Sequence, residues 1–337
     1  MKTINLFVAS LFLLAFLGQD PIAEASHSDI SQAKNSVEEA HRQIWLRFID
    51  QYSILIDYAD FSGNYPRPTA EEYKTNKPNA LAWWTPTENG SMFNGLYMDG
   101  MCRRWLSTRN DNDKEKAKTL AKGLLFLASI GDTPGFIGRS VATDGRTPPA
   151  MGSNDQSSPW FYGLWRYLET GIPDQKERRK IISKMVEVAN VYLTTNWKIP
   201  ATSYSPAKFR NSFASFDWEG APRILFISKA LYSLTKDEKW NTIYLNAARE
   251  RSGSENKSRL DICGAGMHFE KIKLIAGLAF QGLLICWHCM RWKRIPRSEK
   301  YTKKDSMQAP KVLLSQFRSG SNSTIMILRS FSVIGVY

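Results

Sequence analysis

Two short stretches join helical patterns in this chain: Leu106-Ser107-Thr108-Arg109-Asn110-Asp111 and Leu234-Thr235-Lys236-Asp237-Glu238. Each stretch ends one helical pattern and offers a carboxyl or amide side chain that caps the next pattern within a few residues. A connection this short leaves the two helices that it joins antiparallel. These stretches therefore predict a chain built from antiparallel helical hairpins.

Outward from these joints, apolar residues recur at three- and four-residue spacing. This period predicts helices over residues 36–58, 95–108, 114–130, 160–169, 174–197, 218–234, 237–250 and 270–287. Long segments, 62–90, 131–159 and 198–217, alternate with the short joints, so we expect short turns on one face and long loops on the other. Strand-like alternation is scarce, and no repeat period indicates a solenoid.

The predicted fold class is all-α, an (α/α) toroid of antiparallel helical hairpins. A closed ring of six hairpins needs about twelve helices, so we expect a ring that is incomplete at the C-terminus.

The chain is predicted to have three parts. Residues 1–25 resemble a signal peptide: a basic start, an uncharged run over 6–17, and small residues at Ala23 and Ala25. The run is shorter than the roughly 20 residues of a membrane span, although an uncleaved anchor is the alternative. Residues 26–290 form the helical domain, and 291–337 form a basic, poorly ordered or aberrant tail. The protein is expected to be secreted or periplasmic.

Composition excludes several classes of protein. The 337 residues are 43% apolar and 12% aromatic, which excludes a disordered chain. Of the net charge of +13, the tail carries +8 and the rest only +5, so we expect no nucleic-acid partner, and no membrane contact after signal cleavage. Four cysteines are too few for a disulfide scaffold, and residues 286–289 form a lone CxxC. The four histidines form no metal-binding motif, so we expect no metal. The sequence contains no glycine-rich phosphate-binding motif, so we expect no cofactor. Oligomeric state is left open.

Chemistry is predicted in the loop over 131–159, which combines Asp, Arg, Asn and Gln with glycines and prolines that fix the backbone. Glycoside hydrolysis usually needs two carboxyl groups. We expect Asp155, before an aromatic helix start, to be the acid/base, and Asp99, inside an apolar helix, to be its partner. The residues expected to contact substrate are Trp160, Arg139, Arg146, Trp84, Glu88, Asp144 and Gln156.

Most of these residues also have a structural interpretation. Asp155 is equally placed to cap the following helix, and Asp99 to pair with Arg103 four residues along. Asp144 before Gly145 is typical of a turn. The arginines are suited to bracing the loop and the tryptophans to the core, and Glu88 is a further catalytic candidate.

Several motifs resemble one family. They are the entry Asn89-Gly90-Ser91-Met92-Phe93-Asn94-Gly95-Leu96-Tyr97, the Asp-bearing loop before Trp160, and Phe216-Asp217-Trp218-Glu219-Gly220-Ala221-Pro222. The chain over roughly 36–290 resembles the six-hairpin glycosidase superfamily, nearest to the unsaturated glucuronyl and related uronyl hydrolases. That resemblance implies an (α/α)6 toroid in which two aspartates on the loop face serve the site. One protonates a vinyl ether double bond as water adds, releasing an unsaturated uronic acid.

By this resemblance, Asp155 matches the acid/base and Asp99 its partner, with Trp160 and Arg139 as ring and carboxylate contacts. The sequence thus predicts an exported hydrolase of uronate-containing oligo- or polysaccharides, acting through carboxylate acid/base catalysis. The alternatives are a polysaccharide lyase of the same architecture, for which Tyr162 is the candidate base, and a non-catalytic or decayed glycan-binding toroid.

Overall fold

The computed structural model describes residues 27–75, 86–252 and 256–265. The chain divides into two units, one containing residues 1–41 and 319–337 and the other residues 42–318. The predicted signal peptide, Trp84, the helix expected over 270–287, the CxxC and the basic tail lie outside the described residues.

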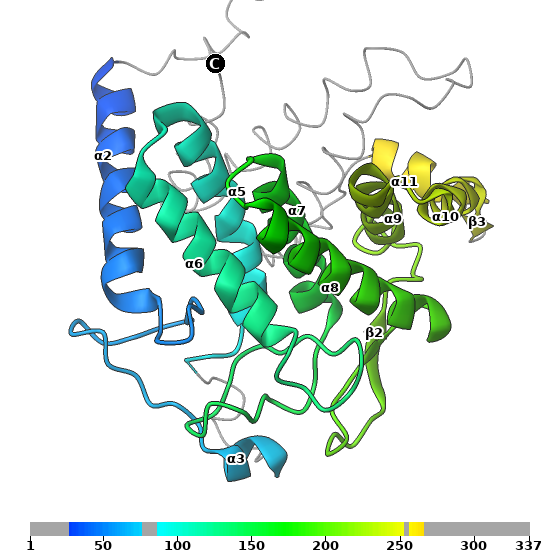
Figure 1. Cartoon of the computed structure of the whole chain (residues 1–337), viewed down its shortest axis with the longest axis horizontal. Coiled ribbons are helices and arrows are strands. Elements are labelled where there is room, and N and C mark those ends of the chain that lie inside the picture. Colours follow the sequence, from blue (N-terminus) through cyan, green and yellow to red (C-terminus); the bar gives the residue numbers. More distant parts are fainter. Residues whose placement is uncertain (1–26, 76–85, 253–255, 266–337) are drawn as a thin grey trace, which may run out of the picture. The chain divides into compact units, whose positions relative to one another are not determined.

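The described chain is mostly helical with only short strands, which confirms the all-α class (Figure 1). The first unit contributes most of α2 (His27–Gln43). The elements that follow are the π-helix η1 (Ile44–Phe48), α3 (Ala70–Lys74), α5 (Gly90–Thr108), α6 (Asp111–Leu127), α7 (Asn154–Glu169), α8 (Gln175–Thr194), β1 (Lys198–Pro200), β2 (Phe209–Ser212), α9 (Ala221–Thr235), α10 (Glu238–Arg249), β3 (Arg251–Ser252), β4 (Lys257–Ser258) and α11 (Arg259–Ala265).

Helices α5 and α6 form the first predicted hairpin. Arg109 ends α5 in the left-handed conformation, and the Asn110 side chain accepts a hydrogen bond from the N–H of Asn112 at the start of α6. Arg104, late in α5, contacts Asp113, early in α6, with an Nε to Oδ1 distance of 2.9 Å. The pair is antiparallel, as the short joint predicts.

Two further hairpins share this design. The phenol of Tyr167 near the end of α7 donates to Glu177 in the first turn of α8, with an oxygen–oxygen distance of 3.1 Å. Lys236 ends α9 in the left-handed conformation, and Asp237 caps α10 through the N–H of Lys239. Asp174 caps α8 in the same way. The joints at 106–111 and 234–238 are therefore confirmed as hairpin turns.

Helices α5 and α7 lie side by side and run in the same direction. Met92 near the start of α5 contacts Gln156 near the start of α7, and Asp99 further along α5 contacts Arg166 further along α7. Gly95 permits the close approach, because a Cβ there would lie 2.1 Å from the carbonyl oxygen of Pro159 in α7. The start of both helices thus faces the same end of the structure.

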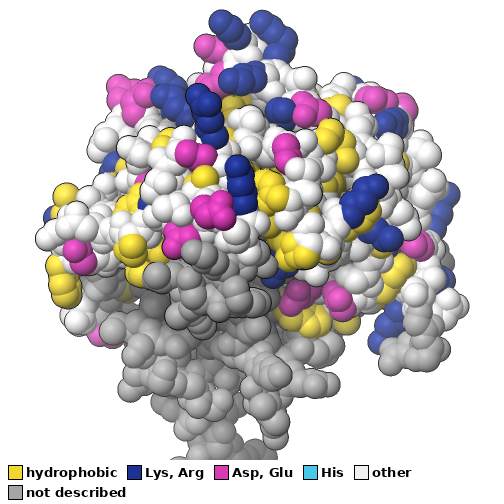
Figure 2. Space-filling view, turned by 90° about the horizontal axis from the view of Figure 1, so that it is seen from below, with side chains coloured by type: hydrophobic (Ala, Val, Ile, Leu, Met, Phe, Trp, Pro, Cys, Tyr) yellow, Lys and Arg dark blue, Asp and Glu magenta, His cyan; other side chains and the backbone are white. Residues whose placement is uncertain are grey.

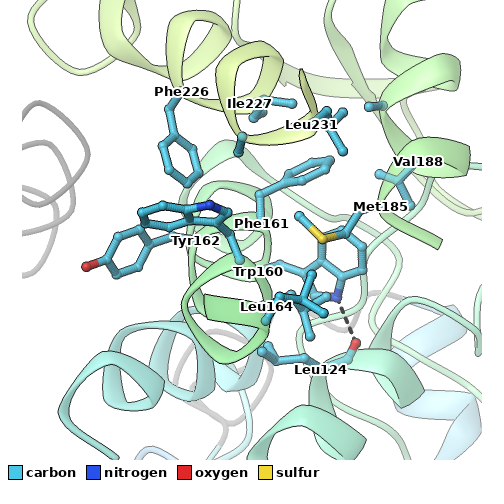
Figure 3. Packing of buried hydrophobic residues seen from close by; sticks show 14 of the residues in the cluster. Leu124, Trp160, Phe161, Tyr162, Leu164, Met185, Val188, Phe226, Ile227 and Leu231 are labelled. Atoms are coloured by element: carbon cyan, nitrogen blue, oxygen red, sulfur yellow. Dashed lines mark hydrogen bonds between the residues drawn. The ribbon is translucent and has the colours of Figure 1, made fainter. Parts of the chain in front are cut away.

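Helix α7 is the centre of the core. Its residues from Gln156 to Trp165 are all buried, as expected for a helix that is covered on every side. Phe226 of α9 packs against Tyr162, with ring centroids 5.9 Å apart (Figure 3). It also packs against Trp165, with ring centroids 5.6 Å apart. The Trp160 indole N–H donates to the carbonyl oxygen of Leu124 in α6 over 2.7 Å (Figure 3).

The prediction of one helix over 36–58 is wrong after Phe48. The Asp50 carboxylate accepts hydrogen bonds from the N–H groups of Tyr52 and Ile54, which folds the chain into a tight turn, and Ser53 takes a positive φ of 66°. Such side-chain bonds to backbone compete with the helical ladder. Residues 49–58 consequently form an extended, irregular segment.

The long loop over 131–153 is fixed to the helices. The N–H of Gly138 donates to the carbonyl oxygen of Leu127 over 2.8 Å, and the N–H of Gly90 donates to that of Arg139 over 2.9 Å. Met151 pairs with Ala201 in an isolated β-bridge, beside the antiparallel β1–β2 pair. The loop therefore presents its side chains at the starts of α5 and α7. Within the described residues, no helix is both long and apolar enough to cross a membrane.

Candidate functional site

A chain of side-chain hydrogen bonds ties the start of α7 to the start of α5. The Gln156 carbonyl oxygen accepts from the N–H of Met92 over 3.1 Å, and its amide nitrogen donates to Asn89 over 3.0 Å. The amide nitrogen of Asn89 in turn donates to Asp57 over 2.5 Å. Gln156 is fully buried, so these bonds satisfy a polar group that has lost its water.

Asp57 ends this chain at the start of α5. Its second oxygen accepts the backbone N–H groups of Glu88 and Asn89, each over 2.9 Å. Burial nevertheless raises the pKa of Asp57, because the charged form loses hydration, while the hydrogen bonds from Asn89 and Glu88 and the charge of Arg139 oppose that rise.

Arg139 is a buried guanidinium that braces three segments. Its Nε donates to the carbonyl oxygen of Met151 over 3.2 Å, and its terminal nitrogens donate to that of Glu88 over 3.4 Å and to the Ser153 hydroxyl over 2.7 Å. The side chain is only 8% exposed. The predicted loop-bracing interpretation of Arg139 is therefore what the contacts show.

The same guanidinium lies between two carboxylates. Asp155 Oδ1 is 3.6 Å from one terminal nitrogen, and Glu88 Oε1 is 3.9 Å from the other. Asp155 also accepts a hydrogen bond from the Ser153 hydroxyl. Because both oxygens lie near one planar group, they are at most about 10 Å apart, which includes the separations at which paired carboxyl groups hydrolyse glycosides. The Asp155 side chain is 21% exposed and that of Glu88 34%, so solvent reaches both.

The carboxyl group of Glu88 has a raised pKa. Burial raises its pKa, the charge of Arg139 opposes the rise, and the nearby charge of Asp57 adds to it. Arg210 on β2 completes the charged group, since it interacts with Arg139, Asp155 and Glu88. Figure 2 shows the described surface on the lower side of Figure 1, where Lys and Arg side chains are interspersed with Asp and Glu.

Asp99 is not brought together with Asp155. It is held by Arg103, with an Nε to Oδ2 distance of 3.0 Å, and by Arg166, with an Nε to Oδ1 distance of 2.5 Å. Arg166 lies eleven residues beyond Asp155 on α7, about 16 Å along the axis. The predicted pairing of the two aspartates is thus corrected. The alternative of an ion pair with Arg103 is confirmed, because a carboxylate inside an apolar helix needs such partners.

The other predicted contacts separate into core and turn residues. Trp160 is 0% exposed and bonded to Leu124, so its predicted contact with a sugar ring is corrected to a core position. Asp144 accepts from the N–H groups of Arg146 and Thr147, which is the turn interpretation. Arg146 is exposed. Glu88, Arg139, Asp155 and Gln156 are brought together.

Sequence reasoning missed four members of the cluster: Asp57, Asn89, Ser153 and Arg210. Asp57 was hidden inside the helix wrongly predicted over 36–58. Asn89 and Ser153 stand at the N-cap positions of α5 and α7, where their residue types are common, although neither side chain caps its helix. Arg210 lies in β2, inside the long segment 198–217, which has no periodic pattern, and no local signal marks it.

The cluster offers two partly exposed carboxyl groups, a cation between them and the starts of two helices. Partial positive charge at a helix start favours anions. Among the residues that the structure describes, no group of three His, Cys, Asp or Glu side chains is placed to hold a metal ion. A surface groove between α6 and α8, lined in part by Lys122, Phe126 and Lys180, contains none of the predicted site residues.

We compared the chain with protein families, curated proteins and solved structures. No family model, curated protein or solved structure matches the chain.

Proposed function

We propose that the protein is an exported carbohydrate-active hydrolase that acts on uronate-containing oligo- or polysaccharides, built on a toroid of helical hairpins. The observation that carries the proposal is one guanidinium, Arg139, between two solvent-accessible carboxyl groups, Asp155 and Glu88, at the starts of parallel helices. Three consecutive hairpins and the shared direction of α5 and α7 favour the toroid.

The chemistry needs one proton donor and one acceptor. In the proposed reaction Asp155 is the acid/base, and Glu88 replaces Asp99 as its partner. Burial raises the pKa of Glu88, which suits this group to hold a proton, and Asp155 accepts the Ser153 hydroxyl and lies 3.6 Å from a terminal nitrogen of Arg139. A carboxylic acid gives its proton to one carbon of the substrate's vinyl ether double bond, whose π electrons form the new C–H bond. The water oxygen then bonds to the other carbon of that double bond, and the water's proton goes to the carboxylate. The hydrated ring opens, the glycosidic C–O bond breaks, and the leaving alcohol takes the proton of the new hydroxyl.

A lyase is less well supported by the geometry. Tyr162, the candidate base, is fully buried in the core beside Trp165 and Phe226. A lyase base must reach the proton on the sugar carbon, and a phenol in this position does not meet solvent. A non-catalytic glycan-binding protein remains the second candidate, because the same polar cluster would hold a saccharide without turning it over.

The test offers the purified protein a panel of unsaturated uronate oligosaccharides made by lyase digestion. Loss of the double-bond ultraviolet absorbance reports the reaction. We expect Asp155→Asn to lower kcat by about 100-fold or more, the usual contribution of a positioned acid or base. Asp111→Asn is the matched control, since Asp111 also lies in the first turn of a helix, α6, but away from the cluster.

Two results would contradict the proposal. One is a folded wild-type protein that consumes no substrate of the panel. The other is turnover that Asp155→Asn and Asp111→Asn reduce equally. Binding without turnover would favour the glycan-binding protein instead.

A further inference from the structure

Arg210 is positioned by β2 at the start of α7. The antiparallel β1–β2 pair holds the backbone, and the neighbouring Asn211 donates from its amide nitrogen to the side-chain oxygen of Asn154 over 3.0 Å. Asn154 immediately precedes Asp155. Arg210 therefore belongs to a segment that is tied to the catalytic candidate, although fifty-five residues of sequence separate the two.

The guanidinium of Arg210 has nitrogens that are available to a ligand. Among the described residues it takes part in no hydrogen bond and in no ion pair within 4.0 Å, and its side chain is exposed. The contrast is with Arg139, whose nitrogens donate to Met151, Glu88 and Ser153. The guanidinium of Arg139 lies between two carboxylates, whereas the N–H groups of Arg210 have no acceptor among the described residues.

The charges around Arg210 are of both signs. Partial burial and the like charge of Arg139 lower the pKa of Arg210, while Asp155 and Glu88 oppose that shift. The other guanidinium near Asp155, that of Arg223, is 4% exposed and pairs with Glu219 over 3.4 Å. Of these guanidinium groups, Arg210 is the one that a ligand reaches.

We propose that Arg210 binds the carboxylate of an acidic sugar and so selects uronate-containing substrates at this site. The inference rests on the proposed function and deepens it by assigning the residue that recognises acidity. The planar fork of a guanidinium matches a carboxylate through two parallel hydrogen bonds. A sulfate ester offers similar acceptors, and the experiment separates the two.

The experiment measures binding by calorimetry, independent of turnover. The probes are a glucuronate-containing tetrasaccharide, the same tetrasaccharide with its carboxylates methyl-esterified, and a tetrasaccharide without carboxylates whose only charge is one sulfate ester. We expect the wild-type protein to bind the acidic sugar about 10–100-fold more tightly than the ester, the usual effect of a charge-assisted hydrogen bond. Arg210→Ala should remove that difference, and Arg210→Lys should retain part of it because the charge remains.

The matched control is Arg179→Ala, which removes an exposed arginine of α8 and should leave the preference unchanged. Thermal unfolding should be the same for the wild type and the three variants, because the Arg210 guanidinium makes no hydrogen bond and no ion pair within 4.0 Å among the described residues.

Four results overturn the inference: wild-type binding that is equal for the acid and its ester, no binding of the acid, a preference that survives in Arg210→Ala, or tighter binding of the sulfated sugar than of the uronate. If hydrolysis fails while Arg210→Ala abolishes the preference, the proposed reaction is wrong and the assignment of Arg210 stands.

Discussion

Replacing Gly95 by alanine should separate the two parallel helices that carry the site. A Cβ at Gly95 would lie 2.1 Å from the carbonyl oxygen of Pro159 and 2.8 Å from its Cβ. Carbon–oxygen contacts below 3.0 Å essentially never occur, so α5 and α7 would have to move apart by about 1 Å. The contact is with backbone, and no change of rotamer relieves it.

The magnitude follows from two opposing effects. Overpacking a well-packed interface costs about 1–3 kcal/mol, and alanine in place of glycine inside a helix gains about 1 kcal/mol. Because the clash at Gly95 involves backbone, we expect the upper end of the cost and a net loss of about 2 kcal/mol. For a unit of this size that corresponds to a fall in Tm of about 4–8 °C.

The assay is urea and thermal unfolding of Gly95→Ala beside Gly100→Ala. Gly100 lies on the same helix, and a Cβ there would have nothing within 4 Å. The control should therefore gain about 0.5–1 kcal/mol from helix propensity alone. If the two variants shift stability in the same direction, the close approach of α5 and α7 is not as described.

Two more predictions concern the carboxylates. Asp99→Asn should lower the free energy of unfolding by about 3 kcal/mol, because Arg166 would be left buried without its partner. The kcat per folded molecule should stay near the wild-type value. A selective loss of kcat would instead indicate that Asp99 is catalytic. Burial raises the pKa of Glu88 above its usual 4.5. The stability of the wild type relative to Glu88→Gln should therefore be greatest below pH 4.5 and fall as the pH rises through the raised pKa. Urea midpoints of both proteins between pH 4 and 8 measure this, and a wild-type advantage that grows with pH would contradict it.

Much of the helical architecture follows from local sequence. The caps at Asn110, Asp174 and Asp237 and the left-handed residues Arg109 and Lys236 are short-range features, so the joints were predictable. The first residues of the helices were less predictable than the joints. The helix expected from Trp160 begins at Asn154, because polar residues in its first turns are buried against α5 rather than exposed.

The site was predictable only in part. Asp155, Glu88 and Arg139 were found because they lie in loops rich in glycine and proline, where function concentrates. Their grouping depends on contacts such as that of Arg139 with Glu88, fifty-one residues apart, which no periodicity encodes. The same limit applies to Asp99: the sequence indicates its ion pair with Arg103, four residues along, but not the one with Arg166, which is sixty-seven residues away.

The position of the cluster has a physical cause in the direction of the helices. Because α5 and α7 are parallel, the unpaired N–H groups and the positive dipole ends of both helices face one end of the structure. Such ends favour negative charge, and the carboxyl groups of Asp57 and Asp155 lie at that end. Antiparallel neighbours would place one positive and one negative end together and cancel this effect. A chain of hairpins whose first helices are parallel thus brings anion-favouring helix starts together beneath its long loops, where the carboxyl groups of the proposed site lie.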